Sequence, residues 1–182
     1  MQIENKQLID DLLERIDRST ALVQKFKEIS IEKLNYKKSK DKWSLLECIE
    51  HLNLYGDFYL PEIEKRILTQ KSTANSNIFK SGIIGNYFAN LMQVKNGKIK
   101  KMKSPKDKNP ANSQLSVTIL DRFLKQQEKL KLLLIQSLNV DLTKTKTAIS
   151  LTNLIKLRLG DTFRFLIYHI ERHILQAQQT QA

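Results

Sequence analysis

Apolar residues recur at helical spacing in four separate stretches of the chain. The first covers about residues 2–29, the second 44–68, the third 113–138 and the last 160–179. In each stretch, residues three and four positions apart are apolar and charged residues lie mostly off that face, which is typical of amphipathic helices. Four such helices predict an all-α protein with a four-helix bundle as its architecture. In the first stretch, the residues expected to face inward are Leu8, Ile9, Leu12, Leu13, Ile16, Ala21, Leu22 and Phe26.

Local signals mark where the second helix begins and where it is interrupted. Ser44 and Glu47 are spaced as a capping box, in which each side chain bonds an unpaired backbone N–H at the start of a helix. Pro61 lies inside the same stretch. Because proline has no N–H and its ring clashes with the preceding turn, we expect Pro61 to kink the helix, or to end it and start another.

The segments between the helices differ in character. Residues 30–42 are polar and rich in lysine, which indicates a connection. Residues 69–113 hold three of the five glycines and two of the three prolines, so we expect a long surface connection with one short helix over about 78–94. Residues 140–159 are rich in Thr and β-branched residues, and should form a connection with a helical turn or an extended piece. The expected fold is one domain, 1–182, with a long loop and a short helix between its second and third long helices.

Composition narrows the class of protein. A chain of 182 residues is long enough to bury a sizeable core without disulfides. The single cysteine, Cys48, excludes a disulfide framework and fits a reducing compartment, so we expect a cytoplasmic location. Residues 1–6 lead directly into amphipathic sequence and do not resemble a signal peptide. No window approaches the roughly 18 uncharged apolar residues of a membrane span, and no membrane partner is expected.

The positive charge of the chain makes nucleic acid a partner to consider. Lys and Arg outnumber Asp and Glu by 31 to 19, which gives a formal net charge of +12. Residues 95–108 contain seven lysines and one aspartate, which is half of that charge. Nucleic-acid recognition uses Arg forks or stacking aromatics, and this stretch has neither. A solvated loop is therefore favoured over a nucleic-acid-binding segment, and the same charge would attract an anionic substrate.

The three histidines are the residues that point to chemistry. His169 and His173 are four residues apart on the last predicted helix, so their rings project from one face about a turn apart. Leu166 and Ile170 share that face, and we expect the pair to point inward. Two imidazoles at this spacing can chelate a transition metal, and His51 from a facing helix would complete a three-nitrogen site with an open position. The spacing alone leaves a second interpretation open, in which these are hydrogen-bonded core histidines.

Three blocks of sequence resemble the DinB/YfiT-like family. Residues 43–52, WSLLECIEHL, resemble the start of its second helix, W-S-x-x-E-x-x-x-H-L. Residues 159–176, LGDTFRFLIYHIERHILQ, resemble its closing helix, and residues 102–105, MKSP, resemble its k-x-[ST]-P loop. The order and spacing of these blocks cover nearly the whole chain, which makes the resemblance far more specific than the histidine spacing alone.

This resemblance implies a four-helix bundle of the DinB/YfiT-like type with a divalent metal held by His51, His169 and His173. Zn²⁺ or Ni²⁺ is the preferred ion, and Mn²⁺ or Fe²⁺ is the alternative. Similar proteins include S-transferases that use bacillithiol or mycothiol, and relatives of maleylpyruvate isomerase. The substrate expected is a small molecule, with a low-molecular-weight thiol among the candidates. The metal would either lower the pKa of that thiol or activate water for hydrolysis, and nothing in the residues chooses between the two.

Three functions therefore stay open. The first is a metal-dependent enzyme, either a thiol S-transferase or a hydrolase. The second is a metal-binding, stress-related bundle without catalysis, and the third, less favoured, is a basic nucleic-acid-binding module. Bundles of this kind often pair through exposed helix faces, so a homodimer is also compatible with the sequence.

Residues near the histidines have two interpretations each. Glu47 lies one turn before His51, where it would either orient the imidazole or only cap the helix. Cys48 is favoured as a small buried residue over a fourth metal ligand. Tyr55 and Tyr168 either line a pocket or pack in the core, and core packing is the more common fate of such residues.

Overall fold

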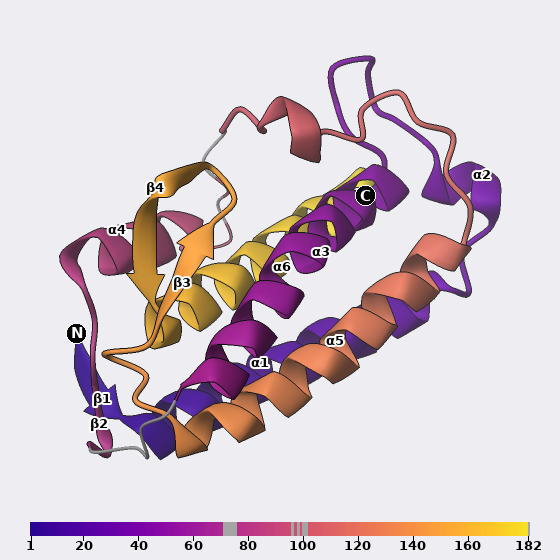
Figure 1. Ribbon diagram of the computed structural model, residues 1–182. Coiled ribbons are helices and arrows are strands. Elements are labelled where there is room, and N and C mark those ends of the chain that lie inside the picture. Colours follow the sequence, from indigo (N-terminus) through magenta and orange to yellow (C-terminus); the bar gives the residue numbers. More distant parts are fainter. Residues whose placement is uncertain (71–75, 96, 98, 100–101, 182) are drawn as a thin grey trace.

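The computed structural model describes residues 1–70, 76–95, 97, 99 and 102–181 (Figure 1). The described chain is mostly helical, which confirms the expectation of a predominantly α-helical protein. The long helices are α1 (Asn5–Phe26), α3 (Leu45–Thr69), α5 (Thr118–Gln136) and α6 (Leu159–Gln181). The shorter ones are α2 (Ile31–Leu34) and α4 (Ile83–Met92). No helix in the described part of the chain is both long enough and apolar enough to cross a membrane.

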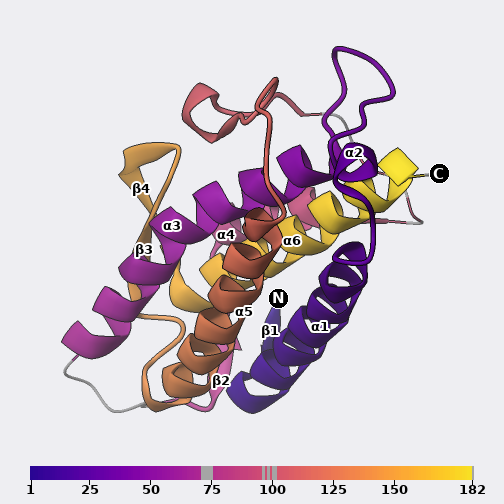
Figure 2. The ribbon, with the colours of Figure 1, turned by 90° about the vertical axis from the view of Figure 1, so that its right-hand side faces the viewer.

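The four long helices pack against one another around the core (Figures 1 and 2). α3 contacts α5 and α6, and α1 contacts the same two helices. Each helix contributes side chains that are completely buried, among them Ile16, Ile49, Phe123 and Phe163. Because full burial of such a side chain stabilises a fold by about 1.5–3 kcal/mol, this shared core holds α3 and α6 in fixed positions relative to each other.

The inward face of α1 follows the predicted stripe in its first half and departs from it in its second. Ala21 is exposed and Leu22 is only partly buried, so the prediction was wrong at Ala21. Ser19 and Val23 take the buried positions instead. These residues continue the three- and four-residue spacing from Ile16, whereas Ala21 lies on the opposite side of the helix.

Pro61 does not end the second long helix, contrary to one of the two outcomes expected for it. α3 continues from Leu45 to Thr69 with Pro61 inside it. Asp57, whose carbonyl loses its helical partner because Pro61 has no N–H, is exposed, as is Pro61 itself. Water can therefore donate a hydrogen bond to that carbonyl, while Tyr59 and Ile63 on either side stay buried in the core.

Two small antiparallel sheets occupy segments that were predicted as helix or connection. β1 (Gln2–Glu4) pairs with β2 (Ile78–Lys80), and β3 (Lys146–Ile149) pairs with β4 (Thr152–Arg158). The first helix therefore begins at Asn5 and not at residue 2. The short helix expected over about 78–94 is divided into β2 and α4, and the extended piece expected within 140–159 is a β-hairpin.

Two connections meet at the end of the molecule where α3 begins. Residues 35–43 follow α2, and residues 102–115 contain the 3₁₀ turn η1 (Lys106–Lys108). Side chains of the first connection bond the second: Asn35 Nδ2 to Leu115 O at 2.9 Å, Lys37 Nζ to Asn112 Oδ1 at 3.3 Å, and Trp43 Nε1 to Asn109 Oδ1 at 3.2 Å. Of the lysine-rich stretch 95–108, residues 96, 98, 100 and 101 lie outside the described residues.

Candidate metal centre

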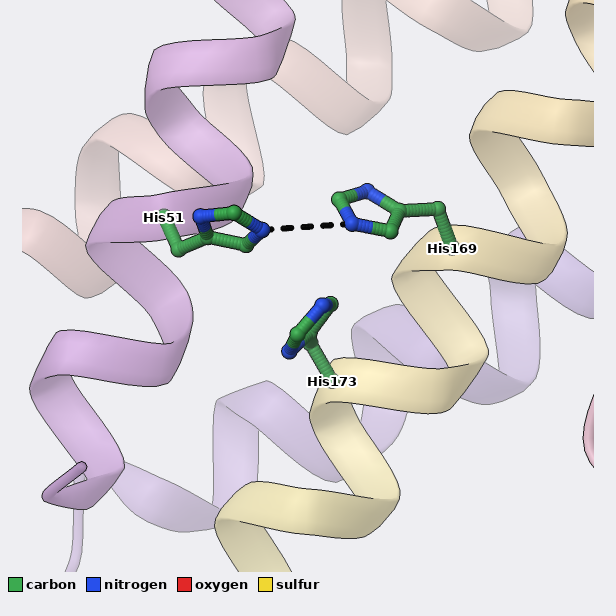
Figure 3. A group of neighbouring side chains, drawn as sticks. All are labelled: His51, His169 and His173. Atoms are coloured by element: carbon green, nitrogen blue, oxygen red, sulfur yellow. Dashed lines mark hydrogen bonds between the residues drawn. The ribbon is translucent and has the colours of Figure 1, made fainter. Parts of the chain in front are cut away.

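The packing of α3 against α6 brings the three histidines together (Figure 3). His51 lies on α3, and His169 and His173 lie one turn apart on α6 with their rings turned toward His51. The capping box fixes where α3 starts, because Ser44 Oγ accepts the Glu47 N–H and the Glu47 carboxylate accepts the Ser44 N–H. The register of His51 relative to α6 follows from that start.

The three imidazoles are close enough to share one ligand. A nitrogen from each ring lies within 4.8 Å of a nitrogen from the other two, and the ring centroids are 4.5–5.0 Å apart. Nε2 of His51 lies 3.2 Å from Nε2 of His169. All three side chains are buried, with exposed fractions of 2% for His51, 4% for His169 and 9% for His173.

A backbone carbonyl sets the protonation of His51. Its Nδ1 lies 2.5 Å from the carbonyl oxygen of Lys108 in η1. A carbonyl can only accept, so Nδ1 carries the proton and Nε2 is left with a lone pair directed at His169. Ser104 Oγ also donates to this carbonyl, at 3.3 Å. Sequence reasoning did not identify this partner of His51, although the Ser104-Pro105 block belonged to the family resemblance.

Burial keeps the imidazoles neutral. Burial lowers the pKa of His51 from its ordinary 6.5 to about 4, with the Lys108 carbonyl raising it and the Lys108 charge lowering it. Burial also lowers the pKa of His169 well below 6.5, helped by the neighbouring His173 and His51 and by Arg172. For His173 the pKa is again lowered well below 6.5 by burial, then by His51 and Arg172, while a hydrogen bond with Gln176 raises it. Neutral imidazole is the form that binds a metal.

The donor set fits a divalent transition metal. Imidazole nitrogen suits Zn²⁺, Ni²⁺ and Fe²⁺, and no Cys, Asp or Glu of the described chain joins the group. Structural zinc sites use four protein ligands, whereas three leave a position for a further molecule. In addition, Nδ1 of His169 and Nδ1 of His173 are buried without a hydrogen-bond partner among the described residues, so no hydrogen bond at Nδ1 fixes the tautomer of either ring.

Aromatic side chains enclose the histidines. The Trp43 ring centroid is 4.7 Å from that of His51, and the Tyr55 centroid is 4.4 Å from that of His169. Phe165 stacks on His169 at 5.8 Å with an interplanar angle of 6°. These rings make the surroundings apolar, which strengthens electrostatic interactions at the centre.

The two tyrosines named from the sequence have different positions. Tyr55 borders the histidines and also packs against Tyr59, so it both lines the site and belongs to the core. Tyr168 lies away from this group, with the Arg15 guanidinium 5.1 Å from its ring centroid. Core packing is therefore the role of Tyr168.

Glu47 and Cys48 support the helix and the core. The buried Glu47 carboxylate bonds Ser44, Lys37 Nζ at 3.1 Å and the Asn112 N–H at 2.6 Å, so it caps α3 and ties two connections to it. None of these hydrogen bonds goes to an imidazole. Cys48 is completely buried, and burial followed by the Glu47 charge raises the pKa of its thiol. A thiol that stays protonated is a poor ligand, and Cys48 acts as a buried apolar residue.

A buried ion pair anchors the start of α6. Asp161 is completely buried and accepts hydrogen bonds from Ser81 Oγ, from the Gly82 N–H at 2.8 Å and from Arg164 at 3.1 Å. Arg164 in turn bonds Asn86 Oδ1 of α4 at 3.1 Å. Asp161 and Arg164, the D-x-x-R part of the closing block, thus join α4 to α6. They influence the position of the histidines only by holding α6 in place.

The comparisons with known proteins agree with this arrangement. The family model for the DinB superfamily matches residues 11–177, a span that contains all three histidines. Neither the search of curated proteins nor the search of solved structures gave a significant match. Because the family model covers nearly the whole chain, the protein belongs to the DinB superfamily.

Proposed function

We propose that the protein is a metal-dependent enzyme, with a four-helix bundle of the DinB type as its single domain. His51, His169 and His173 would hold one divalent ion, with Zn²⁺ or Ni²⁺ favoured over Mn²⁺ or Fe²⁺. The observation that carries this proposal is the meeting of three buried, neutral imidazoles from two helices within 4.8 Å. Three protein ligands are typical of catalytic sites, whereas a structural site would use four.

The surrounding residues have separable roles in this function. The Lys108 carbonyl holds His51 in the tautomer whose Nε2 can act as a ligand. Trp43, Tyr55 and Phe165 keep bulk water away from the three rings. A bound divalent ion would supply Lewis acidity, which lowers the pKa of a thiol or of water in the open position.

The reaction we favour is the transfer of a small thiol to an electrophilic carbon. The thiol first releases its proton to solvent. Its sulfur then forms a bond to the carbon while the bond from that carbon to the leaving group breaks, and the leaving group departs with the electron pair. The aromatic enclosure supports this choice over hydrolysis, because an apolar site favours a sulfur nucleophile and an apolar acceptor over water.

The metal content of purified protein tests the site. We expect protein purified without added metal to contain close to one divalent ion per chain by elemental analysis. The double variant His169→Ala, His173→Ala should contain none. A matched control, Gln178→Ala, Gln179→Ala, changes two exposed positions of the same helix and should keep the metal. Equal metal content in the histidine variant and the control would refute the proposed site, provided that circular dichroism shows both to be helical.

Activity assays test the reaction separately. The loaded protein should transfer at least one of several small thiols to a chlorinated or epoxide acceptor, with the loss of free thiol as the readout. The double histidine variant should be inactive. A protein that binds metal yet fails with every thiol and with hydrolytic substrates would instead be a metal-binding bundle without catalysis.

A further inference from the structure

Lys108 approaches the candidate metal centre with both its backbone and its side chain. Its carbonyl oxygen lies 2.5 Å from Nδ1 of His51. Its side chain is only 15% exposed, and its positive charge acts on His51. The turn η1, which contains this residue, contacts α3, and its segment passes over α3 at the top of Figure 1.

The charge of Lys108 is only weakly compensated. Its Nζ lies 3.4 Å from a carboxylate oxygen of Asp107, whose side chain is 66% exposed. An ion pair with so exposed a partner contributes little, because water and salt screen it. The positive charge is therefore available to a second anion. By contrast, Lys37 of the neighbouring connection is bonded to the buried Glu47 and to Asn112.

Lys108 differs in burial from Lys106, the other lysine of the same turn. Lys106 is exposed, whereas Lys108 is partly buried and adjoins the histidine group. A single ammonium beside an apolar, aromatic enclosure matches one negative charge. It lacks the planar fork with which an Arg binds an anion in bidentate fashion.

We propose that Lys108 Nζ binds a carboxylate of the small molecule that enters the site. This inference rests on the proposed function and specifies its substrate class: a small thiol that carries a carboxylate. The sulfur would bind at the position that the three imidazoles leave open, and the carboxylate would bind the ammonium of Lys108. Lys108 would then determine specificity through its side chain, while its carbonyl continues to orient His51.

The test compares two thiols with the same three-carbon chain, one ending in a carboxylate and the other in an uncharged hydroxyl. The wild-type protein is loaded with Co²⁺, and 3-mercaptopropionate and 3-mercaptopropanol are titrated while the absorption spectrum of the cobalt is followed. We expect the carboxylate to bind more tightly than the alcohol. The variant Lys108→Gln should weaken 3-mercaptopropionate by about tenfold, the value of one charge-assisted hydrogen bond, and leave 3-mercaptopropanol unchanged. Lys108→Arg should restore most of the preference.

A matched control and the cobalt content separate the outcomes. Lys106→Gln removes the same charge from an exposed position of the same turn and should change neither affinity. All three lysine variants should bind cobalt as the wild type does, because the backbone carbonyl is kept. If cobalt binds but Lys108→Gln keeps the preference for the carboxylate, or if Lys106→Gln loses it equally, the role of Lys108 is refuted and the metal site stands. If the wild type binds no cobalt, the proposed function fails with it.

Discussion

Acid should lower the free energy of unfolding of the metal-free protein, because His51 is buried in its neutral form. The folded chain holds the pKa of His51 at about 4, below the ordinary 6.5 that applies after unfolding. Between these two values the unfolded chain binds a proton that the folded chain does not. The stability contributed by neutral His51 is therefore complete above pH 6.5, and it is lost as the pH falls from 6.5 toward 4.

The size of this loss follows from the pKa difference. Each pKa unit corresponds to about 1.4 kcal/mol, so a fall from 6.5 to about 4 gives a loss of about 3 kcal/mol from His51 alone. His169 and His173 shift in the same direction and add to the effect. A loss of this size is a large part of the roughly 5–15 kcal/mol by which a domain of this kind is stable.

The assay is urea unfolding of EDTA-treated protein between about pH 7 and about pH 4.5, with wild type and His51→Gln in parallel. Carboxylates that titrate in this range affect both proteins alike, so the difference between the two reports His51. We expect the wild type to lose about 2.5 kcal/mol more than the variant over the range, because pH 4.5 is still above the folded pKa of about 4. Parallel loss in the two proteins would show that the imidazole of His51 is not held neutral by burial.

Three further perturbations test the fold and the site. Asp161→Ala should lower the free energy of unfolding by about 3 kcal/mol, measured by urea titration, because it leaves Arg164 buried without its carboxylate partner. Asp10→Ala, which removes an exposed ion pair, should change it by less than about 1 kcal/mol. Gly160→Ala would place a methyl group 2.6 Å from the Phe79 ring and should cost about 1–3 kcal/mol, measured as a lower urea midpoint. Zn²⁺ at a thousand times its Kd should stabilise the wild type by about 4 kcal/mol in thermal unfolding, and the double histidine variant not at all.

The helices could be predicted from the sequence because their signals are local. The apolar spacing of α1, α3, α5 and α6 and the Ser44–Glu47 capping box depend on residues a few positions apart. The β1–β2 pair could not be predicted in this way, since it joins Gln2 to Lys80 and each strand is only three residues long. The outcome at Pro61 depended on which face of the helix met water, a property of the packed structure.

The candidate site was predictable in unequal parts. The spacing of His169 and His173 indicated a pair on one face of a helix. His51 was a possible third ligand from a facing helix, and the family resemblance then implied all three as one site. The Lys108 carbonyl had no signal of its own, because every residue has a carbonyl and only the path of the chain brings this one to His51. For Glu47, the sequence left two roles open, and the hydrogen bonds to Ser44, Lys37 and Asn112 now account for its carboxylate.

The separation of the histidines along the chain has a consequence for when the site can form in the cell. His51 and His169 are 118 residues apart. At the usual rate of about 5–20 residues per second, roughly 6–24 seconds of synthesis separate them on the ribosome. During that interval His51 is a lone imidazole, which cannot chelate. Any ion that the three histidines take together must therefore arrive after the last helix has been made.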